Sequence, residues 1–230
     1  MTIDEAETYA NARGKGWHIM NMAAESANQM LEIIEFGSLN GQTSLESGVS
    51  DLEYTQNQNC SAITGSTASL GNTTGHADMT ISINNSVEIE NTDASKRAIS
   101  YRGMENPWGN MWRMIGGINI KGDGNSQGGA PYICTDFNYT PDTIGENYEY
   151  IGFNLPSTYG WISAFGYGSE KYDWILLPAE CANTVNSLVP VGDNLWTIAN
   201  VNVNKIVAVG GSYNYKDNNY HIMKNENIGY

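Results

Sequence analysis

Both helical patterns of this chain lie before residue 38, and this placement constrains the fold more than any other feature. Beyond them the sequence breaks into short apolar runs that Gly and Asn interrupt at nearly every gap, which is typical of short strands joined by turns. Helices first and strands afterwards favour an α+β fold, with the helices packed on an irregular, mostly antiparallel sheet. We expect one domain over residues 1–230, because the sequence shows neither an internal repeat nor a long linker.

Local signals bound the first predicted helix. Thr2 with Glu5 three residues later is a capping-box pattern, which begins a helix. Gly14 and Gly16 then end it. The apolar segment Trp17–Met20 that follows predicts a short buried strand, and we expect its histidine to be satisfied within the core.

The second predicted helix covers about residues 23–36. Asn21 suits the N-cap, and Gly37 suits the C-terminal stop. Apolar residues recur at helical spacing along it, so the helix is amphipathic. The residues that share this apolar face are Ala23, Ala27, Met30, Leu31 and Ile34.

The remaining elements are predicted to be short. Residues 38–78 are rich in Ser, Thr, Asn and Gly with weak periodicity, so we expect a long irregular insertion there. Met79, Ile81 and Ile83 alternate with polar residues, as in a half-buried strand. Further strands are predicted at 98–101, 117–120, 132–135, 150–154, 161–165, 174–177 and 206–209.

The charge balance narrows the classes of partner. The chain carries 25 acidic and 11 basic residues, a net charge of -14, which argues against nucleic acid as a partner. Only 16% of residues are charged, so much of the surface is uncharged and polar, which suits loops and binding faces. The acidity either serves solubility or attracts a cation or cationic partner. Asp123 with Asn125 offers oxygen ligands for Ca²⁺ or forms a plain turn, and we expect no cofactor.

Cysteine usage and hydropathy indicate how the chain is assembled. The chain has only three cysteines, which are Cys60, Cys134 and Cys181. A small and odd number of cysteines argues against a disulfide framework and fits assembly in a reducing cytosol. A single Cys134–Cys181 bridge stays open as an alternative. No run reaches the roughly 18 apolar residues of a membrane span, so we expect no membrane insertion.

The C-terminal tract is the candidate binding segment. Residues 212–227 hold three tyrosines among Asn and Ser, with almost no aliphatic side chains. Tyr supplies a large rigid contact area and Asn and Ser supply adaptable hydrogen bonds, as in antibody paratopes. A solvent-exposed, turn-rich loop is the alternative interpretation. The predicted ligand-binding residues are Ser212, Tyr213, Tyr215, Asp217, Asn218, Asn219, Tyr220 and His221.

Three segments, at 13–20, 99–112 and 207–213, together resemble phage tail and receptor-binding proteins with the C-type lectin fold. That group includes formylglycine-generating-enzyme-like domains and the variable proteins of diversity-generating retroelements, such as the major-tropism-determinant group. Gly109-Asn110-Met111-Trp112 looks like its Gly-Asn-Val-Trp motif, and Gly210-Gly211-Ser212 looks like its Gly-Gly-Ser-Trp turn. This chain departs from the pattern with Tyr213 in place of Trp, and it ends at Tyr230 where relatives continue.

The resemblance implies a C-type lectin-like fold whose segment 207–230 is the diversified ligand face. It further implies a virion protein of the tail fibre or baseplate, assembled in the host cytoplasm, that binds a bacterial cell-surface receptor made of protein or carbohydrate. A homotrimer in the virion is expected. We expect the chain to be a fragment or a small separate subunit of such a fibre.

Two other functional classes stay open. A structural virion protein would turn the same tract towards a neighbouring subunit. A glycan-cleaving tail enzyme would need two carboxylates at a fixed separation, and the acidic candidates are Glu146, Glu149, Glu170, Asp173 and Glu180. An oxidase of the formylglycine-generating type needs a cysteine pair near the C-terminus, and no cysteine follows Cys181. We therefore predict a protein that is not an enzyme. Trp108 and Trp112 are expected to be core residues rather than a platform for a sugar ring.

Overall fold

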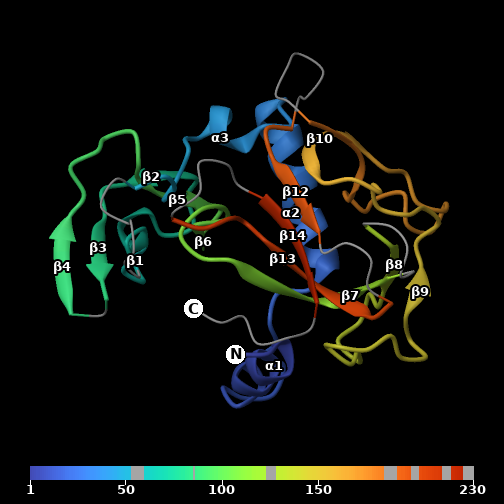
Figure 1. Cartoon of the computed structure of the whole chain (residues 1–230). Coiled ribbons are helices and arrows are strands. Elements are labelled where there is room, and N and C mark those ends of the chain that lie inside the picture. The colour runs from blue at the N-terminus through green and yellow to red at the C-terminus, as the bar shows by residue number, and fades with distance from the viewer. Residues whose placement is uncertain are drawn as a thin grey trace. The chain divides into compact units, whose positions relative to one another are not determined.

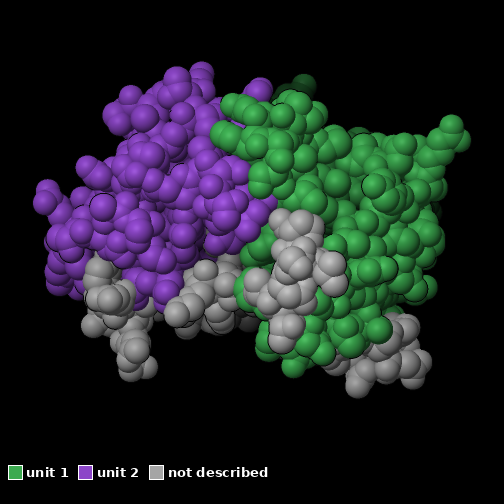
Figure 2. Space-filling view, turned by 90° about the horizontal axis from the view of Figure 1, so that it is seen from above, with its two compact units in different colours: residues 1–39, 114–208, 220–230 green, residues 40–113, 209–219 purple. Residues whose placement is uncertain are grey.

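A computed structural model describes residues 1–52, 60–84, 86–122, 128–183, 191–197, 202–213 and 219–224 (Figure 1). It confirms the α+β class, with helices and mainly antiparallel strands. The chain forms two compact units, each assembled from separate stretches (Figure 2). Unit 1 comprises Met1–Leu39, Met114–Ala208 and Tyr220–Tyr230, and unit 2 comprises Asn40–Arg113 and Val209–Asn219. The single domain over residues 1–230 stays a prediction.

The first helix, α1 (Ile3–Asn11), begins as predicted and ends just before the glycines. Thr2 Oγ1 accepts a hydrogen bond from the Glu5 backbone at 3.2 Å, and Glu5 Oε2 accepts one from the Thr2 backbone at 2.8 Å. These two bonds satisfy backbone donors that a helix start otherwise leaves unpaired.

The predicted buried strand at Trp17–Met20 is wrong. The segment has no strand conformation, and Trp17 is 57% exposed, lying beneath the Arg13 guanidinium. Its backbone groups find other partners, because the Ile19 amide donates to the Glu7 carboxylate and the Met20 carbonyl accepts from Gly116. The apolar composition of this segment was therefore not enough to make it a β-strand.

The bounds of the second helix, α2 (Met22–Phe36), are confirmed. Asn21 Oδ1 accepts a hydrogen bond from the Ala24 amide at 2.9 Å, which caps the first turn. Gly37 ends the helix in the left-handed conformation, with φ of 63°, where a side chain would be strained.

The burial of α2 does not follow its apolar stripe. Leu31 and Ile34 are 40% and 79% exposed, whereas Glu25 and Ser26 are buried. Burial, reinforced by the negative charges of Glu25 and Glu35, raises the pKa of Glu32 to about 7. The helix thus turns polar side chains inward and leaves part of its apolar stripe in solvent.

The largest sheet lies in unit 1 apart from the end residues Arg113, Val209 and Asn219. Its strands, in spatial order, are β11 (Pro178–Ala182), β10 (Gly160–Phe165), β12 (Asn194–Thr197), β14 (Asn219–Lys224), β13 (Asn204–Val209), β7 (Arg113–Lys121), β8 (Ala130–Ile133) and β9 (Glu149–Tyr150). The strand predicted at 174–177 is wrong, because β11 begins only at Pro178. The strand predicted at 150–154 is mostly wrong, because only Tyr150 of that range lies in β9.

The adjacent strands β13 and β7 supply much of the buried core of this sheet. Every residue of β13 from Lys205 to Val209 is buried, and β7 contributes Ile115, Ile118 and Ile120 to the same core. The fully buried Lys205 donates from Nζ to the Gly128 carbonyl at 2.9 Å. A buried cation is costly without such partners, so this bond ties the start of β8 to β13.

Unit 2 holds two small antiparallel sheets. Their strands are β1 (Cys60–Ala62), β3 (Thr80–Ile83) and β4 (Val87–Glu90) in one, and β2 (Gly75–Ala77), β5 (Ala98–Tyr101) and β6 (Met104–Glu105) in the other. The predicted strands at 79–83 and 98–101 are confirmed. The irregular insertion predicted at 38–78 is only partly so, because it contains β1, β2, the short helix α3 (Gly41–Ser44) and the 3₁₀ helix η2 (Ala68–Leu70).

Replacing Glu32 tests the unusual burial of α2. The Glu32 carboxyl has a pKa of about 7 in the fold against 4.5 unfolded, so its contribution is fully favourable below pH 4.5 and is lost as pH rises through 7. Glu32→Gln should therefore raise the free energy of unfolding at pH 8.5 by about 1–2 kcal/mol, discounted for partial solvent screening. At pH 4.5 the substitution should change little. Urea unfolding at both pH values measures this.

Glu146→Gln is the control, because Glu146 is exposed and is not among the charges that raise the Glu32 pKa. It removes the same formal charge from the chain. Equal effects of the two substitutions, or an effect of Glu32→Gln that is the same at both pH values, would contradict the burial of Glu32.

Candidate functional site

The predicted binding tract connects two strands of a hairpin. β13 and β14 are antiparallel neighbours, and Lys205 pairs with Lys224 while Ala208 pairs with His221. The connecting segment, Val209–Asn219, belongs to unit 2. A connection between two paired strands, one of them buried from Lys205 to Val209, starts and ends on a rigid frame, as binding loops do.

The predicted ligand residues fall into three groups. Ser212 and Tyr213 are described with their side chains, whereas Tyr215, Asp217 and Asn218 lie outside the described residues. The remaining three begin β14, where the structure describes the backbone; they are Asn219, Tyr220 and His221. The structure therefore brings the two ends of the tract to the same hairpin.

The start of the tract is joined to the Gly109-Asn110 turn. The Gly109 amide donates to the Gly210 carbonyl, and the Tyr213 amide donates to the Asn110 carbonyl at 3.0 Å. The Tyr213 carbonyl in turn accepts from the Leu52 amide at 3.1 Å. Two of the segments that carry the resemblance, about 100 positions apart in sequence, are thus hydrogen-bonded to each other.

The residue types of this turn follow from its geometry. Gly109 and Asn110 have φ of 72° and 63°, a region that Gly adopts freely and Asn tolerates. A Cβ on Gly109 would lie 2.7 Å from the Val49 carbonyl oxygen, so only Gly fits there. Asn110 Oδ1 accepts a hydrogen bond from the Ala62 backbone amide at 2.8 Å, and the Asn110 backbone amide donates to the Val49 carbonyl at 2.7 Å.

Ser212 and Tyr213 are packed as well as bonded. Ser212 is 7% exposed, and Tyr213 is half-buried against the hydrophobic core of unit 2 beside Val49 and Leu52. These two residues fix where the tract leaves the core. Their contact with a ligand stays a prediction.

Residues near the turn have structural roles that sequence reasoning missed in part. Trp108 is buried, as predicted, and its Nε1 donates to the Glu46 carbonyl at 2.9 Å. Glu105 accepts hydrogen bonds from the backbone of Gly65 and Thr67 at 3.0 and 2.9 Å. These long-range bonds have no signature in the local sequence, because carboxylates at β-strand ends are common.

His18 is held by a carboxylate. Its Nδ1 lies 2.6 Å from Glu7 Oε1, and its ring stacks on Phe137 with centroids 4.4 Å apart. The Tyr139 hydroxyl donates to the other oxygen of Glu7 at 3.2 Å, and burial together with that carboxylate raises the Tyr139 pKa. The predicted satisfied histidine is confirmed, although it does not lie in a strand. This cluster connects α1 to the segment after β8.

The thiols are not activated. All three cysteines are free, so the alternative Cys134–Cys181 bridge is not formed. Burial is the main cause that raises the pKa of both Cys134 and Cys181 to about 11, which keeps them protonated at neutral pH.

Among the acidic candidates, Glu149 is engaged in an ion pair. Glu149 is paired with Lys171 Nζ at 2.6 Å and accepts from the Tyr172 hydroxyl at 2.9 Å, and these bonds lower its pKa. Among the described residues, no group of three or more His, Cys, Asp or Glu side chains could hold a metal ion. The predicted alternative of a cation at Asp123 and Asn125 lies outside the described residues. No described helix is long and apolar enough to cross a bilayer.

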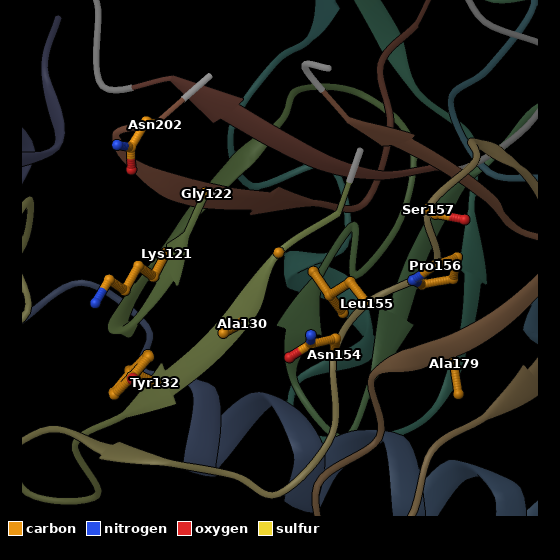
Figure 3. A pocket seen from close by; sticks show the side chains of 11 residues that line it. Lys121, Gly122, Ala130, Tyr132, Asn154, Leu155, Pro156, Ser157, Ala179 and Asn202 are labelled. Carbon is orange, nitrogen blue, oxygen red and sulfur yellow. The ribbon is translucent and has the colours of Figure 1, made fainter. Parts of the chain in front are cut away.

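Unit 1 also contains a cavity of about 650 Å³ that sequence reasoning did not find (Figure 3). It lies between the end of β7, the start of β8 and the segment before β10. The side chains that give it chemical character are Lys121, Tyr132, Asn154, Leu155, Ser157 and Asn202. They come from four separate parts of the chain, so no local motif marks them.

Comparisons with known proteins found no matching family model, no similar curated protein and no similar solved structure. The functional argument therefore rests on the geometry of the hairpin, on side-chain chemistry and on the sequence resemblance.

Substitutions at Asn110 test whether its Oδ1 bond to Ala62 and its positive φ shape the stability of the turn. Asn110→Gly keeps the backbone conformation but loses the Oδ1 acceptor, which should cost about 1 kcal/mol of unfolding free energy. Asn110→Ala loses the acceptor and also strains the backbone at positive φ, so about 2 kcal/mol is expected. Asn110→Asp keeps an acceptor and should cost least. Urea unfolding ranks the three variants, and Ala no worse than Gly would contradict a strained turn.

The reactivity of the thiols tests both their burial and their pairing. With pKa values near 11, Cys134 and Cys181 should react with a disulfide reagent at pH 7.5 on the order of 100-fold slower in the native protein than in urea. Unfolding without reductant should release three reactive thiols per chain. Release of only one would show that a Cys134–Cys181 bridge exists.

Proposed function

We propose that this chain is a ligand-binding protein of a phage tail or related surface structure, with a C-type lectin-like fold. It presents its Tyr/Asn-rich tract to a bacterial cell-surface receptor, which is a protein or a glycan. The observation that supports this most is the anchoring of Gly210 and Tyr213 on the Gly109-Asn110 turn. That contact joins two of the three segments whose ordered combination carries the resemblance.

Fixing the two ends of the tract reduces the conformational entropy that is lost on binding. A loop that must be ordered on binding loses affinity, because immobilising each rotamer-rich side chain costs about 0.5–1.5 kcal/mol. Here β13 and the bonds to Tyr213 fix one end of the tract, and β14 fixes the other. Tyrosine side chains on such a base add contact area with only two rotatable angles each. The arrangement favours recognition over catalysis.

The assembly proposed for this function is a homotrimer in the virion, at a tail fibre or baseplate. Several copies on one particle would raise the avidity for a cell surface well above the affinity of one site. A modest affinity per tract would then be enough for attachment.

Tyrosine substitutions in the tract test the proposal. Tyr215→Ala and Tyr220→Ala, singly and together, should weaken binding of the labelled protein to susceptible cells in a panel of bacterial strains by about tenfold or more. Tyr213 is left unchanged, because it packs on the core of unit 2 and its loss would also destabilise the fold. Tyr167→Ala is the matched control, since Tyr167 is 86% exposed and lies outside the tract.

Three outcomes would contradict this function. Binding to cells that is unchanged in the double variant would exclude the tract as the contact face. Release of reducing sugar from bacterial polysaccharide would indicate a glycan-cleaving enzyme. Stable assembly with other tail proteins through the tract, without cell binding, would indicate a structural virion protein.

A further inference from the structure

We propose that the cavity in unit 1 binds a saccharide of one or two rings and prefers an acidic sugar over its neutral parent. Its volume of about 650 Å³ lies within the usual range for small-molecule sites and accommodates such a ligand. The proposal does not depend on the C-terminal tract, because none of the residues that line the cavity lies within 212–227.

The backbone around the cavity is tightly packed, so the cavity is preformed. The Leu155 amide donates to the Gly129 carbonyl at 3.0 Å, and the Gly122 amide donates to the Val203 carbonyl at 3.0 Å. A Cβ on Gly128 would lie 2.4 Å from the Pro156 carbonyl oxygen, which shows how closely the two segments cross. A preformed site loses little entropy when a ligand enters.

One wall combines an aromatic face with an oriented amide. Tyr132 is half-buried on β8 and opposes Tyr150 across the strand pair, with ring centroids 5.7 Å apart. The Tyr150 hydroxyl donates to Asn154 Oδ1 at 3.0 Å, which directs the amide nitrogen of Asn154 away from that bond. An aromatic face accepts the apolar side of a sugar ring, and amide groups accept and donate to its hydroxyls.

The opposite wall continues this mixture of surfaces. Figure 3 shows Lys121 and Tyr132 on one side, Ser157 and Ala179 on the other, and Asn154 and Leu155 between them. Leu155 is buried and apolar, whereas Ser157 and Asn154 are exposed and polar. Alternating apolar and hydrogen-bonding surface matches a pyranose ring better than it matches a purely apolar ligand.

The charge of the cavity sets the preference among sugars. The chain as a whole carries -14, yet the described residues that line this cavity include Lys121 and no carboxylate. An acidic ligand is therefore attracted locally although the protein repels anions overall. An exposed ammonium within about 4 Å of a carboxylate contributes about fivefold in affinity at the dielectric constant of water.

The experiment is saturation-transfer NMR on the full chain, with titrations of glucose and glucuronic acid and with acetate as the anion control. Glucuronic acid should bind about fivefold more tightly than glucose, and acetate should not compete at equal concentration. Lys121→Gln should remove the preference and leave glucose binding unchanged. Lys15→Gln, which removes an exposed lysine outside the cavity, should leave both affinities unchanged.

Two further variants separate sugar binding from folding. Tyr132→Ala should reduce both affinities by about tenfold, as loss of an aromatic contact does. Asn202→Ala removes an exposed amide at the rim and should weaken binding without altering the thermal melting curve. Two results would overturn the proposal. One is the absence of saturation transfer to either sugar at tens of millimolar, and the other is displacement of glucuronic acid by an equal concentration of acetate. Retained sugar binding in the Tyr215→Ala and Tyr220→Ala variants is expected, so this site and the tract fail or succeed independently.

Discussion

The turn at Gly109-Asn110 is the constraint on which unit 2 depends. Its two residues adopt positive φ, and their backbone and side-chain groups bond to Val49, Ala62 and the Gly210–Tyr213 segment. Three stretches of chain that are distant in sequence meet there through directed hydrogen bonds rather than through regular strand pairing. Because a buried backbone group without a partner is costly, this turn determines the path of all three. The same hydrogen bonds fix the position at which the candidate tract begins.

Sequence predicted best where a structure is decided by neighbouring residues. The capping box of α1 and the Asn21 cap and Gly37 stop of α2 all depend on contacts within a few positions. The alternation of Met79, Ile81 and Ile83 also sufficed, because one face of that strand meets the core of unit 2. The hydrogen bonds between the two Gly-containing motifs were not predicted and are a finding of the structure.

Prediction failed where tertiary partners replaced local preference. Trp17–Met20 has the composition of a buried strand, but the Glu7 carboxylate and Gly116 take its backbone bonds. The apolar stripe of α2 predicts an inward face, yet Glu25 and Ser26 occupy the buried side. The segment 38–78 lacks periodicity because its short strands have only three residues each, too few to show alternation. The cavity was invisible in sequence, since its lining comes from separate strands.

The two candidate sites obtain rigidity in different ways, and this difference bears on what each can recognise. The tract is a connection fixed at both ends, so its side chains can change without disturbing the sheet that carries them. The cavity is formed by close backbone crossings at Gly128 and Gly129, where added side chains would collide with carbonyl oxygens. A side chain added at Gly128 or Gly129 should therefore be costly, as should the loss of Tyr213, which packs on the core of unit 2. A receptor that varies suits the tract, whereas a small constant chemical group suits the cavity.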